Sequence, residues 1–388
     1  MKKGFLQVFK RELRRMVSRP IYLMMTVIIP TLVIIFFATF LNQGVPNQMP
    51  VAIVDFDNST LSRTISRTIS AGQMCEVKYK LSSYESAKNK MQQGEVYAFV
   101  IIPRNFEKDV YSGKAPIVNF YTEYAHYLGS SLIMKEINTT LTTISIGADL
   151  KMRLMKGENS TQAMAQVNPI SNDVHIIANP LLNYALYLTS IMMPGIIFIM
   201  SMICTVYAIG IELKNASSRR WLVIGKRNIL TALSAKLLPY TLLYTFMIII
   251  SEIVMERIMG FPNEGNPVIM YLGAMFTIIS YQAMGILILG VFPSMRTALS
   301  ITAFYGVMSF TLTGFTYPNE AMLPAVKPFT FLYPLRQYYQ LYCNVQINGL
   351  PFLENIMPFV YLMIFWLVPF IVIMRIKSVA IKLDYERD

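Results

Sequence analysis

The sequence predicts a polytopic α-helical membrane protein with six transmembrane helices and an inserted extracytoplasmic α/β domain. Of the 388 residues, 54% are hydrophobic and only 14% are charged, which leaves too little polar surface for an ordinary soluble domain. The hydrophobic residues gather in long runs without charge, and such runs favour helices because every backbone amide in lipid must be satisfied within its own segment. Strand and helix patterns alternate in the one long polar stretch, which indicates a separate α/β layer.

Residues 21–41 form the first predicted transmembrane helix. This run carries no charge and is long enough to cross a hydrocarbon core of about 30 Å. The polar stretch LNQGVPNQMP follows it in place of a small-residue cleavage site, which argues against a signal peptide. Similar runs predict five more spans, at about residues 183–209, 237–255, 268–292, 298–315 and 356–374. Five prolines are expected to kink or cap the spans: Pro30, Pro194, Pro239, Pro358 and Pro369.

Basic residues predict the orientation of the chain. One set of segments holds 18 Lys and Arg residues against five Asp and Glu: the N-terminal 20 residues, the gap at 210–236, the turn at 293 and the tail at 376–388 with Arg375. Because basic loops stay on the cytoplasmic side, both termini are expected in the cytoplasm and the chain in a bacterial inner membrane. The formal charge of +12 is therefore a topology signal and does not predict nucleic-acid binding.

Residues 42–182 form the predicted extracytoplasmic domain. Strands are expected at 49–57, 75–81, 95–103 and 116–123, with helices at 58–72, 82–94 and 105–113 between them. Ser82 lies three residues before Glu85, the spacing of a capping box. A long helical pattern from 125 to about 156 leads back toward the membrane, followed by a polar loop, NPISNDVH.

Motifs for catalysis or metal binding do not stand out. The GK pair at 225–226 lacks the glycine of a phosphate-binding loop five residues earlier, so the chain is not expected to bind ATP by that route. His126 and His175 are isolated, and surface positions are the simpler interpretation. Cys75 and Cys343 both fall on the predicted outer side, where a disulfide is one option and free thiols the other.

Five stretches in order resemble the permease subunit of ABC-2 type transporters, in the type V exporter-like branch with a large extracytoplasmic domain after the first helix. They are FKRELRRMVSRPIYLMMTVIIP, VAIVDFDNSTLSRTISRTI, GEVYAFVIIPRNFEKDVYSGKAPIVNFY, the basic gap at 210–236 and GFTYPNEAMLPAVKPFTFLYPLRQYYQ. The resemblance implies a partner ATPase that binds ATP and Mg, a homodimer or a heterodimer with a related permease, and an optional periplasmic adaptor. Relatives usually have Gly-Thr and a Leu-rich turn after the glutamate, whereas KNASSRRW follows Glu212 here.

The resemblance also implies two contacts with the ATPase, a coupling segment at 210–236 and a connecting helix at 1–20. In residues 1–20, Leu6, Phe9, Leu13, Met16 and Val17 fall on one helical stripe and the bases on another, a pattern typical of a helix lying on a membrane surface. The alternative is that the bases only meet anionic lipid and that Trp221 anchors at headgroup depth. The predicted coupling residues are Glu212, Lys214, Arg219, Arg220, Trp221, Lys226, Arg227, Arg11, Arg14 and Arg15.

The second and fifth spans would line a transport pathway at a dimer interface, again by resemblance. A lining rich in Met and aromatic residues suits an amphipathic or hydrophobic cargo, although such stripes also serve helix packing. The predicted lining residues are Met192, Met193, Phe198, Thr302, Tyr305, Phe310 and Thr311. Residues 316–354 are expected to re-enter the outer leaflet in short pieces broken by prolines, with Pro318, Pro324 and Pro334 at an outer gate; the alternative is an interfacial aromatic belt.

Two functions follow from the sequence. The first is the permease of an ATP-driven exporter without enzymatic activity of its own. The second is a membrane scaffold or receptor that transports nothing and whose external domain binds a partner. Association with an ATPase distinguishes them.

Overall fold

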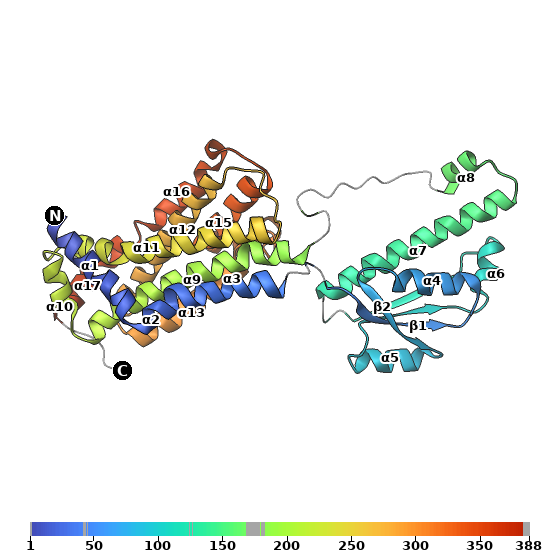
Figure 1. The fold of residues 1–388 in the computed structure, drawn as a ribbon, viewed down its shortest axis with the longest axis horizontal. Coiled ribbons are helices and arrows are strands. Elements are labelled where there is room, and N and C mark those ends of the chain that lie inside the picture. Colours follow the sequence, from blue (N-terminus) through green and yellow to red (C-terminus); the bar gives the residue numbers. More distant parts are fainter. Residues whose placement is uncertain are drawn as a thin grey trace. The chain divides into compact units, whose positions relative to one another are not determined.

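The computed structural model describes residues 2–41, 44, 46–123, 125, 127–167, 179 and 183–382. The chain divides into two compact units, one formed by Met1–Asn42 with Asn183–Asp388 and the other by Gln43–Leu182 (Figure 1). His126, His175 and the loop NPISNDVH lie outside the described residues.

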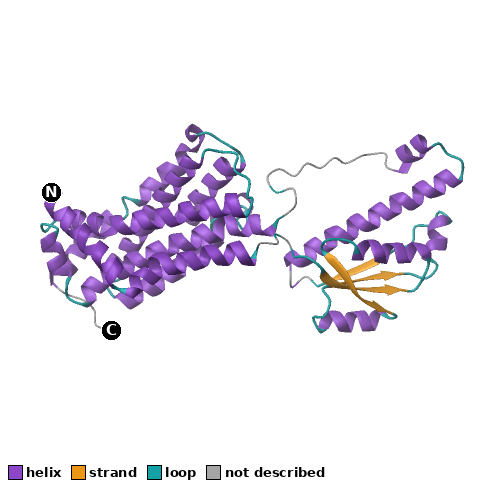
Figure 2. Ribbon diagram, viewed as in Figure 1, coloured by secondary structure: helices purple, strands orange, loops and turns teal. Residues whose placement is uncertain are grey.

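The first unit is a bundle of helices (Figure 2). Long helix α9 packs against α3, α11, α12 and α13. The N-terminal elements are α1 (Lys2–Ser18), α2 (Pro20–Leu23), the π-helical turn η1 (Met24–Ile28) and α3 (Ile29–Phe40). The central elements are α9 (Tyr184–Lys214), α10 (Ser218–Ile224), α11 (Ile229–Ile253), η3 (Val254–Ile258), α12 (Pro267–Val291) and α13 (Met295–Thr311). The remaining elements are η4 (Asn319–Ala321), α14 (Lys327–Thr330), α15 (Pro334–Leu341), η5 (Tyr342–Ile347), η6 (Phe352–Asn355), α16 (Ile356–Phe365) and α17 (Pro369–Lys382).

Five helical stretches of the described chain are long and apolar enough to cross a membrane: Pro20–Phe40, Tyr184–Lys214, Ile229–Ile258, Pro267–Val291 and Phe352–Lys382. The remaining predicted span corresponds to α13, which has 17 residues. At 1.5 Å per residue it is about 26 Å long, shorter than a hydrocarbon core of about 30 Å. The polytopic helical architecture is thus present, and the count of six stays a prediction.

Two helices run well beyond the hydrophobic runs that predict them. Helix α9 continues through Glu212 to Lys214. Helix α11 begins at Ile229, where the side chain of Asn228 accepts hydrogen bonds from the Leu230 and Thr231 amides, a standard N-terminal cap. The gap predicted at 210–236 is therefore mostly helical, which brings Glu212 and Lys236 into the bundle. Capping and backbone hydrogen bonding, rather than hydropathy, set these ends.

The buried face of helix α1 differs from the apolar stripe that the sequence predicts. Gly4, Val8, Glu12 and Met16 recur every four residues and are buried against the bundle. The stripe residues Leu6, Leu13 and Val17 are exposed instead. Together with exposed Lys10 and Arg14, they leave a free amphipathic surface of the kind that lies on a membrane.

The second unit is a four-stranded sheet between helices (Figure 2). The strand order is β2-β1-β3-β4, with β1 parallel to β2 and β3, and β4 antiparallel to β3. Its strands are β1 (Met49–Asp55), β2 (Cys75–Leu81), β3 (Ala98–Ile102) and β4 (Asn119–Thr122). Its helices are α4 (Thr60–Ser70), α5 (Tyr84–Gln92), α6 (Phe106–Tyr111), α7 (Tyr127–Met155) and α8 (Ser160–Val167).

Alternating residues of β1 cover the two faces of the sheet. Val51 and Ile53 pack in the cluster that contains side chains of α4 and α7, whereas Ala52 and Val54 pack with Ala87 of α5. This two-residue period is what a strand buried on both faces requires.

Two smaller points of the sequence analysis concern the cap of α5 and the state of the cysteines. The capping box at Ser82 is wrong by one residue, because Ser83 is the cap of α5 and accepts from the Ser86 amide. All three cysteines are free thiols. Cys75 is buried in the sheet, and burial raises the pKa of its thiol to about 12.

Candidate coupling site

Three fully buried charged residues meet where α1, α9 and α11 come together. Lys236 Nζ of α11 lies 2.8 Å from Glu12 Oε1 of α1 and 3.2 Å from Glu212 Oε1 of α9. All three side chains have no exposed surface. One ammonium group therefore connects two carboxylates from helices that are far apart in the sequence.

Two arginines of α1 complete this ion cluster, which we define as Glu12, Glu212, Lys236, Arg11 and Arg15. Arg11 Nη2 lies 2.9 Å from Glu212 Oε1. Arg15 pairs with Glu212 as well, and its Nη1 lies 3.4 Å from Glu12 Oε1. Burial works to lower the pKa of Arg15, but the Glu212 and Glu12 carboxylates outweigh it and raise that pKa above its ordinary value. The ion cluster holds three cations against two carboxylates.

Neutral groups supply further hydrogen bonds to the carboxylates. The Tyr240 hydroxyl donates to Glu12 Oε2 at 3.3 Å, and the Ser217 hydroxyl donates to Glu212 Oε2. Burying charges is costly, and the cost is offset only when the remaining lone pairs are satisfied in this way. The cluster therefore specifies one arrangement of the three helices, because displacing any of them would leave a buried charge without its partner.

Trp221, predicted as an exposed anchor, is instead a buried packing residue. Its side chain has no exposed surface, its Nε1 donates to the Ala232 carbonyl at 3.3 Å, and Lys236 Nζ lies 5.5 Å from the ring centroid. Neither a contact of this ring with a partner nor one with lipid headgroups fits that position. Trp221 instead fastens α10 to α11 beside the ion cluster.

Six of the predicted coupling residues remain on the surface. Arg219 is exposed and donates to the Ile381 carbonyl, while neighbouring Ser218 donates to the Ala380 carbonyl at 2.9 Å. These two bonds fasten α10 to α17. The exposed set is Arg14, Lys214, Arg219, Arg220, Lys226 and Arg227.

The predicted coupling set thus divides into an inner and an outer group. Glu212, Arg11 and Arg15 belong to the ion cluster, whereas the other six bases are exposed. Sequence reasoning missed Glu12, Lys236, Tyr240 and Ser217. Recognising Asn228 as a helix cap would place Lys236 two turns inside α11, where a lone cation in an apolar pattern needs a partner.

Three of the seven predicted lining residues, Met193, Phe198 and Thr302, are buried within this one subunit. Phe198 stacks on Tyr281 and meets Tyr338 edge to face, with ring centroids 6.0 and 4.7 Å apart. Met193 and Thr302 are likewise inaccessible, which corrects their assignment to an open lining. Partly exposed or exposed positions remain at Met192, Tyr305, Phe310 and Thr311.

Helices α9 and α13 approach each other closely through glycines. A Cβ on Gly195 would lie 2.5 Å from the Phe310 ring, and one on Gly306 would lie 2.9 Å from Ile199. Phe310 is thus part of this packing seam. Tyr305 stacks on Tyr333 at 4.8 Å and donates to the Leu332 carbonyl at 2.6 Å.

The predicted outer gate is a chain of short helical pieces, as its prolines indicate. Pro318 precedes η4, Pro324 lies between elements, and both are exposed. Pro334 is buried and begins α15. Tyr338 of α15 donates to Glu252 Oε1 of α11 at 2.9 Å, and both side chains are buried.

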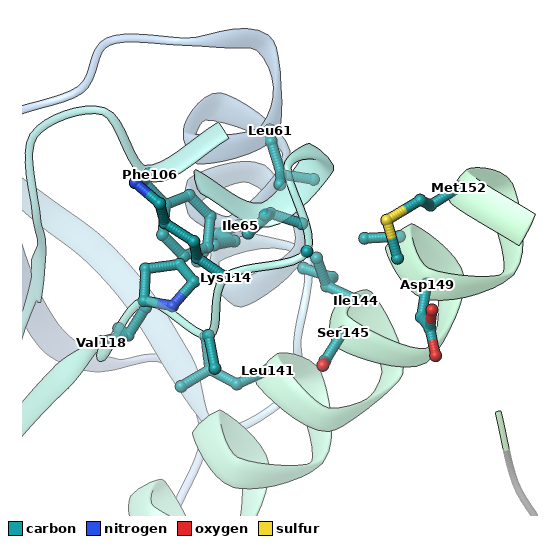
Figure 3. Close-up of a pocket in the computed structure, with 15 residues that line it drawn as sticks. Leu61, Ile65, Phe106, Lys114, Val118, Leu141, Ile144, Ser145, Asp149 and Met152 are labelled. Atoms are coloured by element: carbon teal, nitrogen blue, oxygen red, sulfur yellow. The ribbon is translucent and has the colours of Figure 1, made fainter. Parts of the chain in front are cut away.

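The second unit contains a cavity of about 480 Å³ between α4, α6, α7 and the loop 113–118 (Figure 3). Its walls are largely apolar, with Phe106, Ile65 and Leu141 among them. Lys114, Ser145 and Asp149 supply the polar groups. Among the residues that the structure describes, no three His, Cys, Asp or Glu side chains are grouped to hold a metal ion.

A bundle of long apolar helices with a buried ion cluster defines a multi-pass membrane protein. The chain belongs to the ABC-2 family: the family described as "ABC-2 family transporter protein" matches residues 20–375. It is therefore the membrane component of an ABC transporter, and the family implies a partner ABC ATPase subunit. The predicted resemblance is confirmed at the level of the family. No curated protein matches the chain.

Proposed function

We propose that this chain is the permease subunit of an ATP-driven exporter that moves an amphipathic or hydrophobic molecule outward. ATP and Mg would bind on the partner ATPase, and two permease subunits would form the pathway. The chain would lie in a bacterial inner membrane with both termini in the cytoplasm, because most of its excess basic residues fall on that side of the predicted topology.

The ion cluster is the observation that supports this proposal most strongly. It joins α1 to the ends of two membrane-spanning helices through buried charges. A force on α1 or α10 would therefore reach α9 and α11 directly. A helix held only by a few surface ion pairs would transmit little, because such pairs contribute about 0–1 kcal/mol each.

The exposed bases around the ion cluster would form the docking surface for the ATPase. Lys214 is exposed at the end of α9, Arg220 within α10, and Lys226 and Arg227 in the turn before α11. Arg is favoured at interfaces because it combines a large contact area with several donors. The free apolar stripe of α1 would lie on the membrane beside them.

The transport pathway would form between two subunits along the seam of α9 and α13. Phe304 and Val307 are both 67% exposed on α13, next to exposed Thr311. This apolar surface suits a lipid-like or drug-like cargo. At the other end, the exposed Pro318 and Pro324 segments and α15 would close the pathway toward the outside, and an adaptor could bind there.

Charge reversal of the docking surface tests the proposal. In Lys214→Glu with Arg220→Glu, both side chains are exposed and the bond from Arg219 to α17 is left intact. We expect copurification of the ATPase to fall at least tenfold while the permease still folds. Arg257→Glu is the matched control, since Arg257 is an exposed base in η3 and copurification should be unchanged. Association that survives the double reversal would refute the docking surface.

A second candidate function is a receptor or scaffold whose external unit binds a ligand. The cavity in that unit favours it, because its 480 Å³ falls within the range of about 300–1,000 Å³ that is typical of small-molecule sites. A chain that copurifies with no ATPase, even as wild type under gentle extraction, would favour this function over export.

A further inference from the structure

A second cavity of the sheet unit lies at the carboxyl ends of β1 and β2 and has a volume of about 570 Å³. It is separate from the cavity in Figure 3, which lies between α4, α6 and α7. Buried Ile53 and partly buried Leu81 supply its apolar surface. Polar side chains from α4, α5 and the ends of the strands supply the rest. Ligands of open α/β sheets bind outside the carboxyl ends of the strands, so this edge is a natural place for a site.

A β-bulge in β2 turns Lys80 toward the face of the sheet that α4 covers. The register of β2 against β1 shifts at Lys78. Val77 packs in the cluster that contains side chains of α4 and α7, whereas Tyr79 packs in the cluster on the α5 face. Lys80 consequently lies on the α4 face, next to Ile53 of β1. Bulges re-aim side chains in this way and are frequent near functional sites.

Helix α4 supplies a guanidinium and a hydroxyl to the same cavity. Arg63 is exposed, and its Nη2 donates to the Asn58 carbonyl at 3.1 Å, which orients the group and leaves other donors of the fork available. Ser66 is only 6% exposed. Its hydroxyl has no hydrogen-bond partner in the described part of the chain but keeps some accessible surface, and it lines the cavity. This hydroxyl can therefore donate to a ligand.

The charges that line the cavity are two bases and one carboxylate. Asp55 is engaged by its own surroundings, because its Oδ1 accepts from two backbone amides of the following loop at 3.0 Å and its Oδ2 accepts from the Ser62 hydroxyl at 2.7 Å. Neither Arg63 nor Lys80 forms an ion pair with a carboxylate of the described residues. The groups left for a ligand are thus positively charged donors, which suit an anion.

We propose that this cavity binds a small organic anion. Its phosphate or carboxylate group lies between Lys80 and Arg63 and accepts from the Ser66 hydroxyl, and its apolar body lies against Ile53 and Leu81. The volume falls within the range of about 300–1,000 Å³ that is typical of small-molecule sites, so the ligand is larger than a bare phosphate ion. The site lies wholly within the sheet unit and depends neither on the ATPase nor on the direction of transport.

Two probes that differ in charge test the site on the full chain. The chain in detergent, with its ATPase if that copurifies, is titrated at constant ionic strength with phenyl phosphate or with benzyl alcohol. Both probes carry one aromatic ring, but only phenyl phosphate is an anion. Phenyl phosphate should lower hydrogen exchange in 58–66 and 80–86 in a saturable way, and benzyl alcohol should not. Equal effects of the two probes, or no protection by phenyl phosphate, would overturn the proposal.

Substitutions then assign the binding to the two bases. Lys80→Gln and Arg63→Gln should each weaken binding of phenyl phosphate about three- to tenfold, because each removes a charge-assisted hydrogen bond. Both side chains are exposed, so the fold should be kept. Lys78→Gln is the matched control, since Lys78 is an exposed base of the same strand that does not line the cavity. Normal binding by the Lys80 variant, or an equal loss in the control, would show that the anion does not bind here.

Discussion

Lys236 is the residue on which the ion cluster depends. It bridges a carboxylate of α1 and one of α9 without contact with solvent. Removing one partner of a buried charge pair is much more destabilising than removing a surface pair, because the charges left behind remain desolvated. Without Lys236, the Glu12 and Glu212 carboxylates would still pair with Arg11 and Arg15. Both arginines are partly exposed and lie on α1, so neither replaces the charge that α11 contributes.

Lys236→Met keeps the length of the side chain and removes the charge. We expect it to lower the free energy of unfolding by about 3–5 kcal/mol, measured as the loss of helical signal during denaturation in detergent. Lys214→Met removes the same charge at an exposed position and should change stability by less than about 0.5 kcal/mol. If the two variants are equally stable, Lys236 is not the bridge described here.

Helix α15 shows how a short element is held at the end of the bundle opposite the ion cluster. Leu335, Tyr338 and Leu341 are buried, and α15 packs on α12, α13 and α16. Its polar attachment is the hydrogen bond from the Tyr338 hydroxyl to Glu252 Oε1. Glu252 Oε2 has no partner within the described part of the chain, so this carboxyl depends on Tyr338.

Tyr338→Phe removes that donor and keeps the ring. The expected cost is about 1–3 kcal/mol, because the buried carboxyl loses its partner. Hydrogen exchange should rise in 334–347 before other parts of the bundle. Tyr317→Phe, at an exposed hydroxyl that donates to the Ala321 carbonyl, should leave exchange unchanged. Unaltered protection of α15 in the Tyr338 variant would contradict the attachment.

At the scale of elements, long apolar runs and alternating strands could be read from the sequence, whereas helix ends could not. Hydropathy ends a span where polar residues begin, but α9 and α11 continue because their backbone hydrogen bonds and caps do. The four predicted strands of the second unit are all present. Their two-residue alternation and turn residues are local signals that survive folding.

The candidate site was only partly predictable, since it depends on contacts between distant segments. Glu212 and Arg15 lie 197 positions apart, and no local pattern encodes their pairing. Trp221 was misplaced because a Trp among bases looks the same whether it is exposed or buried. Phe198 and Met193 were assigned to a lining for a similar reason, since a packing stripe and a pathway stripe have the same composition.

In the helical unit as a whole, the buried ion cluster connects the exposed basic surface around it to the long apolar helices. In the proposed exporter, the ATPase would dock on the exposed bases, and its closure would move α1, α9 and α11 together. Docking and transmission are separate steps with separate residues. A variant that breaks the ion cluster should therefore keep the partner and lose the motion.

The most direct test is nucleotide-dependent hydrogen exchange in the complex with the ATPase. In the wild type, ATP should change the exchange of 205–214 and 229–240. The double variant Glu212→Gln with Lys236→Met removes one charge of each sign, leaves Glu12 paired with Arg15, and should copurify with the ATPase as the wild type does. We predict that its exchange no longer responds to ATP in these two segments, whereas a full response in the double variant would contradict transmission through the ion cluster.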